Sequence, residues 1–225
     1  MPIKPKLLDL FCGAGGAARG YYEAGFEVTG VDIKRQPNYP YNFYERDTMD
    51  VLRSEDLSHF DVIHASPPCQ AYSQNRFTSE QKGANYPDLI AEVRTLLRAT
   101  GKPYIIENVQ GASLEYPVML CGTQFGLKVF RHRFFESNVM MFCPTHLPHV
   151  DKACRQGTKP QKENEFMTIT GNFSGVEQGK KAMGIDWMKR SELTQAIPPE
   201  FTKYLGHQLQ NVLVNMNKFQ ERMAA

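Results

Sequence analysis

Cys69 is the residue of this chain best suited to nucleophilic chemistry. It stands in Ser66-Pro67-Pro68-Cys69-Gln70, directly after an apolar run at residues 60–65 that is typical of a buried strand. The two prolines restrict the backbone of this turn and leave a thiol at its tip. A thiolate is a strong nucleophile. Simple packing is the common alternative for a cysteine, but packing needs neither the prolines nor the amide that follows, so we favour a catalytic thiol.

A glycine-rich turn near the N-terminus has the composition of a ligand-binding loop. The segment Phe11-Cys12-Gly13-Ala14-Gly15-Gly16 follows a short apolar run, and Asp32 ends the next predicted strand. Glycines let the backbone approach a ligand closely, and an acid at the end of a second strand can accept hydrogen bonds from a ribose. The spacing is not the Gly-x-Gly-x-x-Gly of dinucleotide binders. A tight turn without a ligand therefore stays open as an interpretation.

The elements that must position these residues alternate along the chain. Short apolar runs predict strands at residues 7–11, 26–32, 60–65 and 103–107. Apolar residues at helical spacing predict helices at 17–24, at 87–100 and from Pro198-Pro199 onward. This alternation predicts an α/β, Rossmann-like fold with a mostly parallel sheet covered on both faces. Cys69 and Glu107 then follow strand ends, where open α/β sheets bind ligands.

Three motifs occur in a characteristic order: Asp9–Gly16, Ser66–Gln70 and Glu107-Asn108-Val109. Together they look like signature motifs of the cytosine carbon-5 DNA methyltransferases. Arg131-His132-Arg133 is similar to the Gln-x-Arg-x-Arg motif of that family, with Val129 in place of the glutamine. Gln195–Pro199 with Gly206 resembles the closing motif, although Thr194-Gln195 replaces the usual Gly-Asn pair. The resemblance spans most of the chain and implies the fold of S-adenosylmethionine-dependent methyltransferases.

The resemblance also implies a role for each motif residue. Cys69 would add to carbon 6 of cytosine, Glu107 would protonate or hydrogen-bond the ring, and Arg133, with Arg131 beside it, would hold the base carbonyl oxygen. S-Adenosylmethionine would be bound by Phe11, Gly13, Gly15, Gly16, Asp32, Asp47 and Pro67. For Glu107 and Arg133, a purely salt-bridging role is the alternative. Methyltransferases that act on exocyclic amino groups carry an aromatic residue after the two prolines, so the cysteine here favours methylation of a ring carbon.

A stacked base cannot offer both faces of its ring, so the target would be flipped out of double-stranded DNA or be single-stranded. The polar residues 71–86 look like a mobile loop that closes over such a base, with an ordinary solvated connection as the alternative. Expected DNA contacts near the nucleophile are Gln70, Ser73 and Arg76.

The interval 138–190 is the expected target-recognition region, and residues 1–137 with 191–225 are the expected catalytic domain. Residues 150–190 hold 8 basic and 5 acidic side chains, a net charge of +3. Lys180, Lys181 and Arg190 are the expected phosphate contacts, which would give mostly sequence-independent affinity. Judged by charge counts alone, a solvated face explains the same residues. The shortness of the interval predicts a short or relaxed target sequence.

One run of cysteines and histidines has spacings that could meet around zinc, namely Cys143-x2-His146-x2-His149-x4-Cys154. Paired Cys-x2-Cys knuckles are absent from it, and two prolines lie inside it. Exposed histidines and unpaired cysteines are therefore the favoured interpretation, and no metal is assigned from the sequence.

Composition sets broad limits. The chain has 225 residues, 41% hydrophobic and 22% charged, with a net charge of +2. These values indicate a globular domain with a modest appendage, and they exclude disorder and coiled coil. Without an apolar run of membrane-spanning length or a cleavage-like N-terminus, we expect no membrane association and a cytoplasmic location in a bacterial or phage-infected cell. Five cysteines suit a reducing compartment. We expect a monomer.

Three other functions remain open at this level. The same chemistry could act on RNA, since some family members methylate tRNA. The chain could instead be a catalytically silent nucleic-acid-binding homologue, which the departures at Val129 and Thr194-Gln195 would suit. Transfer of a group from an altered donor is a further alternative. The target sequence and the biological role, whether restriction-modification, phage protection or regulation, are not readable.

Overall fold

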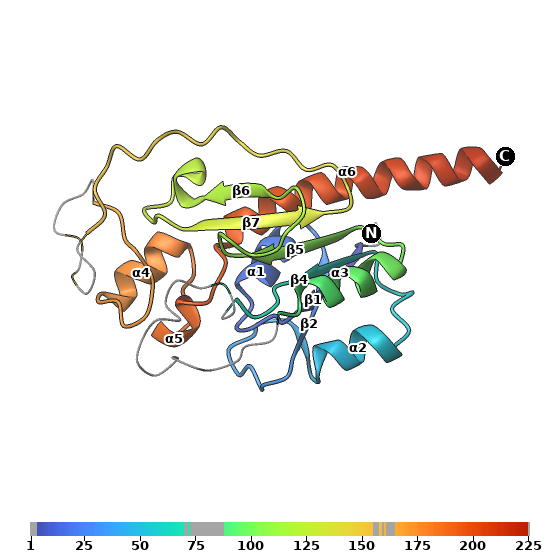
Figure 1. The fold of residues 1–225 in the computed structure, drawn as a ribbon, viewed down its shortest axis with the longest axis horizontal. Coiled ribbons are helices and arrows are strands. Elements are labelled where there is room, and N and C mark those ends of the chain that lie inside the picture. Colours follow the sequence, from blue (N-terminus) through green and yellow to red (C-terminus); the bar gives the residue numbers. More distant parts are fainter. Residues whose placement is uncertain are drawn as a thin grey trace.

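The structure is a computed structural model that describes residues 4–69, 72, 88–154, 158, 160 and 165–224. In this part of the chain, a 7-stranded sheet has the order β3-β2-β1-β4-β5-β7-β6 (Figure 1). The strands are β1 (Lys6–Leu10), β2 (Glu27–Asp32), β3 (Asn42–Glu45), β4 (Val62–Ala65), β5 (Tyr104–Asn108), β6 (Val118–Cys121) and β7 (His132–Ser137). The helices are α1 (Gly16–Glu23), α2 (Thr48–Ser54), α3 (Ile90–Ala99), the 3-10 turn η2 (Gly122–Phe125), α4 (Val176–Met183), α5 (Arg190–Leu193) and α6 (Pro199–Ala224).

The neighbouring strands β3, β2, β1, β4 and β5 are all parallel, whereas β7 runs antiparallel to both β5 and β6. This confirms the prediction of a Rossmann-like, mostly parallel α/β fold. The strand order reverses at β1, which pairs with β2 on one side and β4 on the other. Ligands of open α/β sheets bind at such a reversal, beyond the carboxyl ends of the strands. The turns after β1 and β4 are joined there, because the amide of Ser66 donates to the carbonyl of Leu10 at 3.1 Å.

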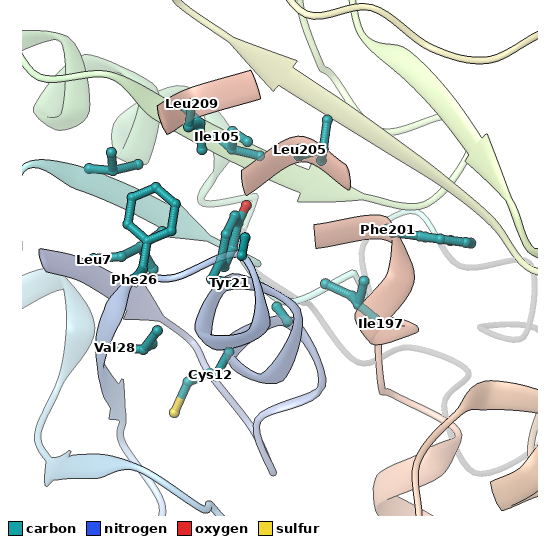
Figure 2. Packing of buried hydrophobic residues seen from close by; sticks show 14 of the residues in the cluster. Leu7, Cys12, Tyr21, Phe26, Val28, Ile105, Ile197, Phe201, Leu205 and Leu209 are labelled. Carbon is teal, nitrogen blue, oxygen red and sulfur yellow. The ribbon is translucent and has the colours of Figure 1, made fainter. Parts of the chain in front are cut away.

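Alternating strand residues build two hydrophobic layers, because successive side chains of a strand point to opposite faces. On one face, Leu7 and Ile105 pack with Tyr21 of α1 and with Phe201 and Leu205 of α6 (Figure 2). The opposite face carries α2 and α3, whose buried side chains pack against Leu8, Leu10, Ile63 and Ile106. The sheet is therefore covered on both faces, as predicted.

A third hydrophobic cluster lies beyond the sheet and includes much of the segment between β7 and α6. Met167, Ile169, Met183 and Ile185 are buried in it, together with Ala14 from the glycine turn. Short helices α4 and α5 occur where the sequence showed few regular signals. Both are too short for apolar periodicity to stand out, and α4 lies between two glycines in the left-handed conformation. The division at 138 and 190 into two regions stays a prediction.

The C-terminal helix begins at Pro199, where it was expected, and its first half packs on α1. Its second half is largely exposed and projects away from the sheet (Figure 1). None of the described helices has both the length and the hydropathy of a bilayer-crossing segment.

Candidate active site

A cavity of about 700 Å³ opens beyond the carboxyl ends of β1, β2, β4 and β5. It brings together residues from all three main motifs and from the segment that precedes α6. Those predicted from the sequence are Phe11, Gly13, Gly16, Asp32, Asp47, Pro67, Cys69, Glu107 and Arg133. Volumes of this size are typical of small-molecule and cofactor sites.

One end of the cavity is formed by the turn after β1 and by Asp32 at the end of β2. The Asp32 carboxylate accepts hydrogen bonds from the amides of Gly13 at 3.0 Å and Lys34 at 2.9 Å. Phe11 and Gly13 both have positive φ, 57° and 50°. A left-handed backbone is unusual for a phenylalanine, and such conformations concentrate at functional turns. No heavy atom lies within 4 Å of a Cβ placed on Gly13, so the turn leaves open space on the cavity side.

Gly15 and Gly16 are required for packing. A Cβ on Gly15 would lie 2.9 Å from the ring of Tyr39, and one on Gly16 would lie 2.5 Å from the carbonyl of Ile197. Gly16 still lines the cavity, whereas Gly15 does not. The close approach of Ile197 brings the segment before α6 against the glycine turn.

Asp47 and Pro67 line the cavity and also hold local structure. Asp47 caps α2, since its Oδ1 accepts from the amide of Met49 at 2.7 Å. The carbonyl of Pro67 accepts from Nδ2 of Asn108 at 3.0 Å. This buried bond ties the turn that carries Cys69 to the end of β5, where Glu107 lies.

The opposite end of the cavity holds the nucleophile candidate and a charged pair. Cys69 is half-buried, and Nε of Arg133 lies 2.9 Å from Oε1 of Glu107. Burial raises the pKa of the Glu107 carboxyl, against the lowering effects of Arg133 and of a hydrogen bond from Ser66. Burial also raises the pKa of the Cys69 thiol, and the negative charge of Glu107 adds to this while Arg133 opposes it. Because the pKa of the Cys69 thiol is raised, the thiol is mostly protonated at neutral pH. It must lose that proton before it can attack a base.

Arg131, which was predicted to lie beside Arg133 at the base, makes its described hydrogen bonds to backbone carbonyls. It is buried, and its guanidinium donates to the carbonyls of Ile169 at 3.0 Å and Thr194 at 2.8 Å. It is not among the residues that line the cavity. These two carbonyls hold the guanidinium of Arg131 outside the cavity, whereas Nε of Arg133, in β7, pairs with Glu107. Arg131 joins the segment after β7 to α5, a positioning role.

Sequence reasoning missed a buried series of hydrogen-bonded side chains beside the Glu107–Arg133 pair. Nδ1 of His64 lies 2.9 Å from the hydroxyl of Tyr21, and Nε2 of His64 lies 2.9 Å from Oγ of Ser66. Burial lowers the pKa of His64 to about 3, so this ring is neutral. A histidine inside the apolar run at 60–65 is the signal that could have revealed it.

Residues of α5 and of the segment before α6 complete the cavity wall, and these too were not predicted as site residues. Glu192 accepts two hydrogen bonds from Nδ2 of Asn38, at 3.0 and 2.9 Å. Trp187 donates to the carbonyl of Ala14 at 2.8 Å and packs against the third hydrophobic cluster. The further lining residues include Met188, Gln195 and Ala196. The closing motif at 195–199 was the available signal.

Of the expected DNA contacts, Gln70, Ser73 and Arg76 lie outside the described residues, as do most of residues 71–86. Lys180 pairs with Glu177 at 3.0 Å on α4. Lys181 and Arg190 are exposed. Arg190 directly precedes Ser191 and Glu192, which line the cavity.

The cysteines of the candidate zinc run do not meet its histidines. Cys143 is exposed, whereas Cys154 is buried in the third cluster and donates to the carbonyl of Thr158. His146 and His149 lie instead beside Cys121 and His132. Spacing along the chain could not show this, because sheet pairing brings the latter two residues in from elsewhere.

Comparison with known proteins identifies the family. Residues 5–116 match the family described as C-5 cytosine-specific DNA methylase. The chain is 32% identical over 118 residues to the Type II methyltransferase M.HgiCI of Herpetosiphon aurantiacus, and 34% identical over 116 residues to M.FnuDI of Fusobacterium nucleatum. Each match covers 47% of this chain, but 27% and 33% of those relatives, so the chain spans a third or less of their length.

Solved structures agree on the fold. A prophage-encoded protein of E. coli, described as a candidate DNA modification methyltransferase, has a TM-score of 0.64 at 15% identity, over 93% of this chain and 99% of its own. The Dnmt2 methyltransferase of S. pombe has a TM-score of 0.59 at 13% identity, with the same coverage.

M.HgiGI of Herpetosiphon aurantiacus is 32% identical over 120 residues, which are 48% of this chain and 94% of that relative. The chain therefore belongs to the C-5 cytosine-specific DNA methylase family.

Proposed function

We propose that this chain is an S-adenosylmethionine-dependent methyltransferase that methylates carbon 5 of cytosine in DNA. The observation that carries the proposal is a single cavity lined both by Asp32 and by Cys69, with Glu107 and Arg133 beside the thiol. A donor at one end and a base at the other would share that cavity. The names of the curated relatives, all Type II methyltransferases, support the choice of DNA.

The residues present suit S-adenosylmethionine. Open space at Gly13 lets a ligand approach the backbone, and the Asp32 carboxylate can accept the hydroxyls of a ribose. Phe11 and Asp47 line the same end of the cavity. When bound, S-adenosylmethionine supplies a methyl group that an electron-rich carbon can attack.

Carbon 5 of cytosine is a poor nucleophile, and Cys69 would change this. Its thiolate adds to carbon 6, forming a carbon–sulfur bond, and the displaced electron pair makes carbon 5 nucleophilic as an enamine. Glu107 would hydrogen-bond or protonate the ring nitrogen during that addition. After carbon 5 is methylated, its proton leaves to a base, the carbon–sulfur bond breaks, and Cys69 departs as the thiolate.

Arg133 would act on two partners. Its ion pair with Glu107 fixes the carboxylate at the end of β5, and its remaining donors can hold the carbonyl oxygen of the base as negative charge develops. Because both faces of the ring must be reached, the target base would be flipped out of the duplex. Residues 138–190 would form the target-recognition region, where Lys181 and Arg190 are exposed for phosphate contacts.

A matched pair of cysteine variants tests this function. Cys69→Ser should abolish methyl transfer while leaving donor binding, measured by calorimetry, unchanged. Cys143→Ser, at an exposed thiol outside the cavity, should retain full activity. Labelled donor with separate DNA and RNA pools identifies the substrate, and bisulfite sequencing of DNA from expressing cells gives the sequence context.

Near-normal activity of Cys69→Ser would overturn the covalent mechanism. DNA containing 5-fluorocytosine provides a second test, because the fluorine cannot leave as a proton does and should trap Cys69 on the base. Failure to trap or methylate any pool would identify a silent homologue. Labelling confined to RNA would reject DNA as the substrate.

A further inference from the structure

Two of the sheet's strands place a cysteine and a histidine side by side, away from the cavity. Cys121 is the last residue of β6 and His132 is the first of β7. The two are direct partners in the antiparallel ladder. Residues that face each other across such a ladder project to the same side of the sheet, so the thiol and the imidazole lie together.

Two more histidines reach this point from the segment that follows β7. Residues 140–150, all of them described, form neither helix nor strand, and in Figure 1 they run back along the outer side of the β6–β7 pair. Nε2 of His149 lies 3.4 Å from Sγ of Cys121 and 3.0 Å from Nε2 of His146. The ring of His132 is 5.2 Å from that of His146 and 5.0 Å from that of His149.

Two of the spacings, 3.0 Å between His146 and His149 and 3.4 Å between His149 and Cys121, are close to the edge lengths of a tetrahedral metal site. All four candidate ligand atoms lie within 4.8 Å of one another. With zinc–nitrogen and zinc–sulfur bonds of their usual lengths, a tetrahedral site has nitrogen–nitrogen edges of about 3.3 Å and sulfur–nitrogen edges of about 3.5 Å. Two acceptor nitrogens as close as those of His146 and His149 repel each other unless a proton or a metal ion lies between them. A single proton does not account for the convergence of the thiol and His132.

The chemical types of the four ligands favour some metals over others. A thiolate with three imidazoles suits zinc, whereas magnesium and calcium require oxygen ligands. Four protein ligands leave no open position, which is the pattern of a structural site. Among the described residues, this is the one group of three or more such side chains arranged to hold a metal.

Partners around the ligands support the same interpretation. The hydroxyl of Thr123 lies 3.3 Å from Sγ of Cys121 and donates to it, as groups around a metal-bound thiolate do. The ring of Phe130 stacks on that of His149, with centroids 4.1 Å apart. These contacts fix the ligands from outside the group.

We propose that Cys121, His132, His146 and His149 bind one structural zinc ion that fastens residues 140–150 to the β6–β7 edge of the sheet. The segment needs such an anchor, because it exposes apolar side chains, including Leu147 and Val150. The hydrogen bonds described for it are few and each involves a side chain, including that from Gln124 to the carbonyl of Pro144 at 2.6 Å. The same ion would hold the segment against the end of the edge strand β6, at Cys121.

Metal analysis of the full chain, purified without a polyhistidine tag, tests the proposal. Elemental analysis should find about one zinc ion per chain. Cys121→Ser and His149→Ala should each lose it, while the matched controls Cys143→Ser and His59→Ala, at exposed residues outside the group, should keep it. His149 is itself exposed, so its variant should fold even if the buried Cys121 variant does not. Thr123→Val should weaken zinc binding by about 10-fold.

Cobalt provides a second, independent measurement. The chain stripped of metal and titrated with Co²⁺ should develop the intense visible bands of a tetrahedral site and a thiolate charge-transfer band, and Cys121→Ser should lose the latter. Chelation should also expose residues 140–150 to proteolysis. Absence of zinc and of these bands in the wild-type chain would overturn the proposal, leaving a hydrogen-bonded cluster. Retention of zinc by both His149→Ala and Cys121→Ser would overturn it too.

Discussion

Nε of Arg133 lies 2.9 Å from Oε1 of Glu107, and the two side chains are only 15% and 8% exposed. The contact follows from sheet register. Glu107 pairs with Phe135 across the β5–β7 ladder, and Arg133 lies two residues before Phe135, so the two are diagonal neighbours on one face. A buried carboxylate thus has its counter-charge supplied by the adjacent strand, beside Cys69.

This pair should set the pH at which Cys69 becomes reactive. Burial raises the pKa of the Cys69 thiol, the Glu107 charge raises it further, and Arg133 lowers it. Glu107→Gln removes a raising effect, so the pH midpoint of Cys69 alkylation by iodoacetamide should fall. Arg133→Met removes a lowering effect and should shift that midpoint upward. Mass spectrometry of the Cys69 peptide measures both shifts, and the exposed Cys143 serves as an internal reference whose profile should not change. Shifts of equal sign in the two variants would contradict the assignment.

Glu107→Gln should also reduce methyl transfer if the proposed mechanism holds. Loss of a positioned acid costs about 10²- to 10⁴-fold in rate, while donor binding, at the other end of the cavity, should change little. Single-turnover kinetics with labelled donor measures the rate and calorimetry measures the affinity. Glu27→Gln, at an exposed glutamate on β2, is the matched control and should behave as wild type. A full rate for Glu107→Gln would remove that residue from the chemistry.

The sequence was sufficient to predict those elements whose apolar patterns are local. Leu8, Leu10 and Ile63 lie in runs that indicate buried strands. Asp32, at the end of β2, and Cys69, after β4, do line one cavity. Strands β6 and β7 were not predicted, because they form the antiparallel extension of the sheet, where pairing and not composition defines the element. Contacts between segments far apart in the sequence could not be predicted either, because they too depend on pairing and not on local composition. Nothing local to Cys121 indicates that it meets His149, 28 residues away.

Asp9 should make stability depend on pH. Burial, with a contribution from the negative charge of Asp32, raises the pKa of Asp9 to about 8. An unfolded aspartate ionises near its ordinary value of about 3.9. Between these values the folded chain binds a proton that the unfolded chain does not, so stability falls as pH rises through this window and is level above it. Asp9→Asn removes this loss. Its stability advantage over wild type should be small near pH 4 and grow to at most on the order of 5 kcal/mol near pH 8.

Urea denaturation of the chain without donor, at several pH values, measures that advantage. Asp186→Asn, at an exposed aspartate, is the control and should follow the wild-type curve. A difference between Asp9→Asn and wild type that does not vary with pH would show that Asp9 is not the titrating group.

Arg94 and Glu136 form a second buried pair, and its loss should destabilise the chain strongly. Nε and Nη2 of Arg94 donate to the two oxygens of Glu136, each at 2.7 Å, and the side chains are 9% and 2% exposed. Arg94→Met leaves the buried carboxylate of Glu136 without its counter-charge, which lowers the free energy of unfolding by about 3–5 kcal/mol. Arg98→Met, whose pair with Glu115 is largely exposed, should cost at most about 1 kcal/mol. Denaturation midpoints compare the two. The double variant Arg94→Met with Glu136→Leu should recover most of the loss, and failure to do so would indicate that Arg94 acts through other contacts.

Gly20 lets α1 and α6 approach closely, so replacing it should separate them. An alanine Cβ there would lie 2.0 Å from the carbonyl of Pro199 and 2.1 Å from Oγ1 of Thr202. Helix propensity alone favours alanine by about 1 kcal/mol. The clash involves the backbone of α6, and overpacking of this kind costs about 1–3 kcal/mol or more, so Gly20→Ala should be destabilising despite the propensity gain.

Gly206→Ala tests the same interface with a milder clash, because its Cβ would meet the Cβ of Ala24 at 2.7 Å. The expected order of stability is wild type, then Gly206→Ala, then Gly20→Ala. Urea denaturation followed by far-ultraviolet circular dichroism measures it. Since α6 begins directly after Ile197, which abuts the glycine turn, Gly20→Ala should also weaken donor binding. A Gly20→Ala chain as stable as wild type would show that the interface can shift at no cost. Unchanged donor binding would show that the closeness of α1 and α6 does not shape the cavity.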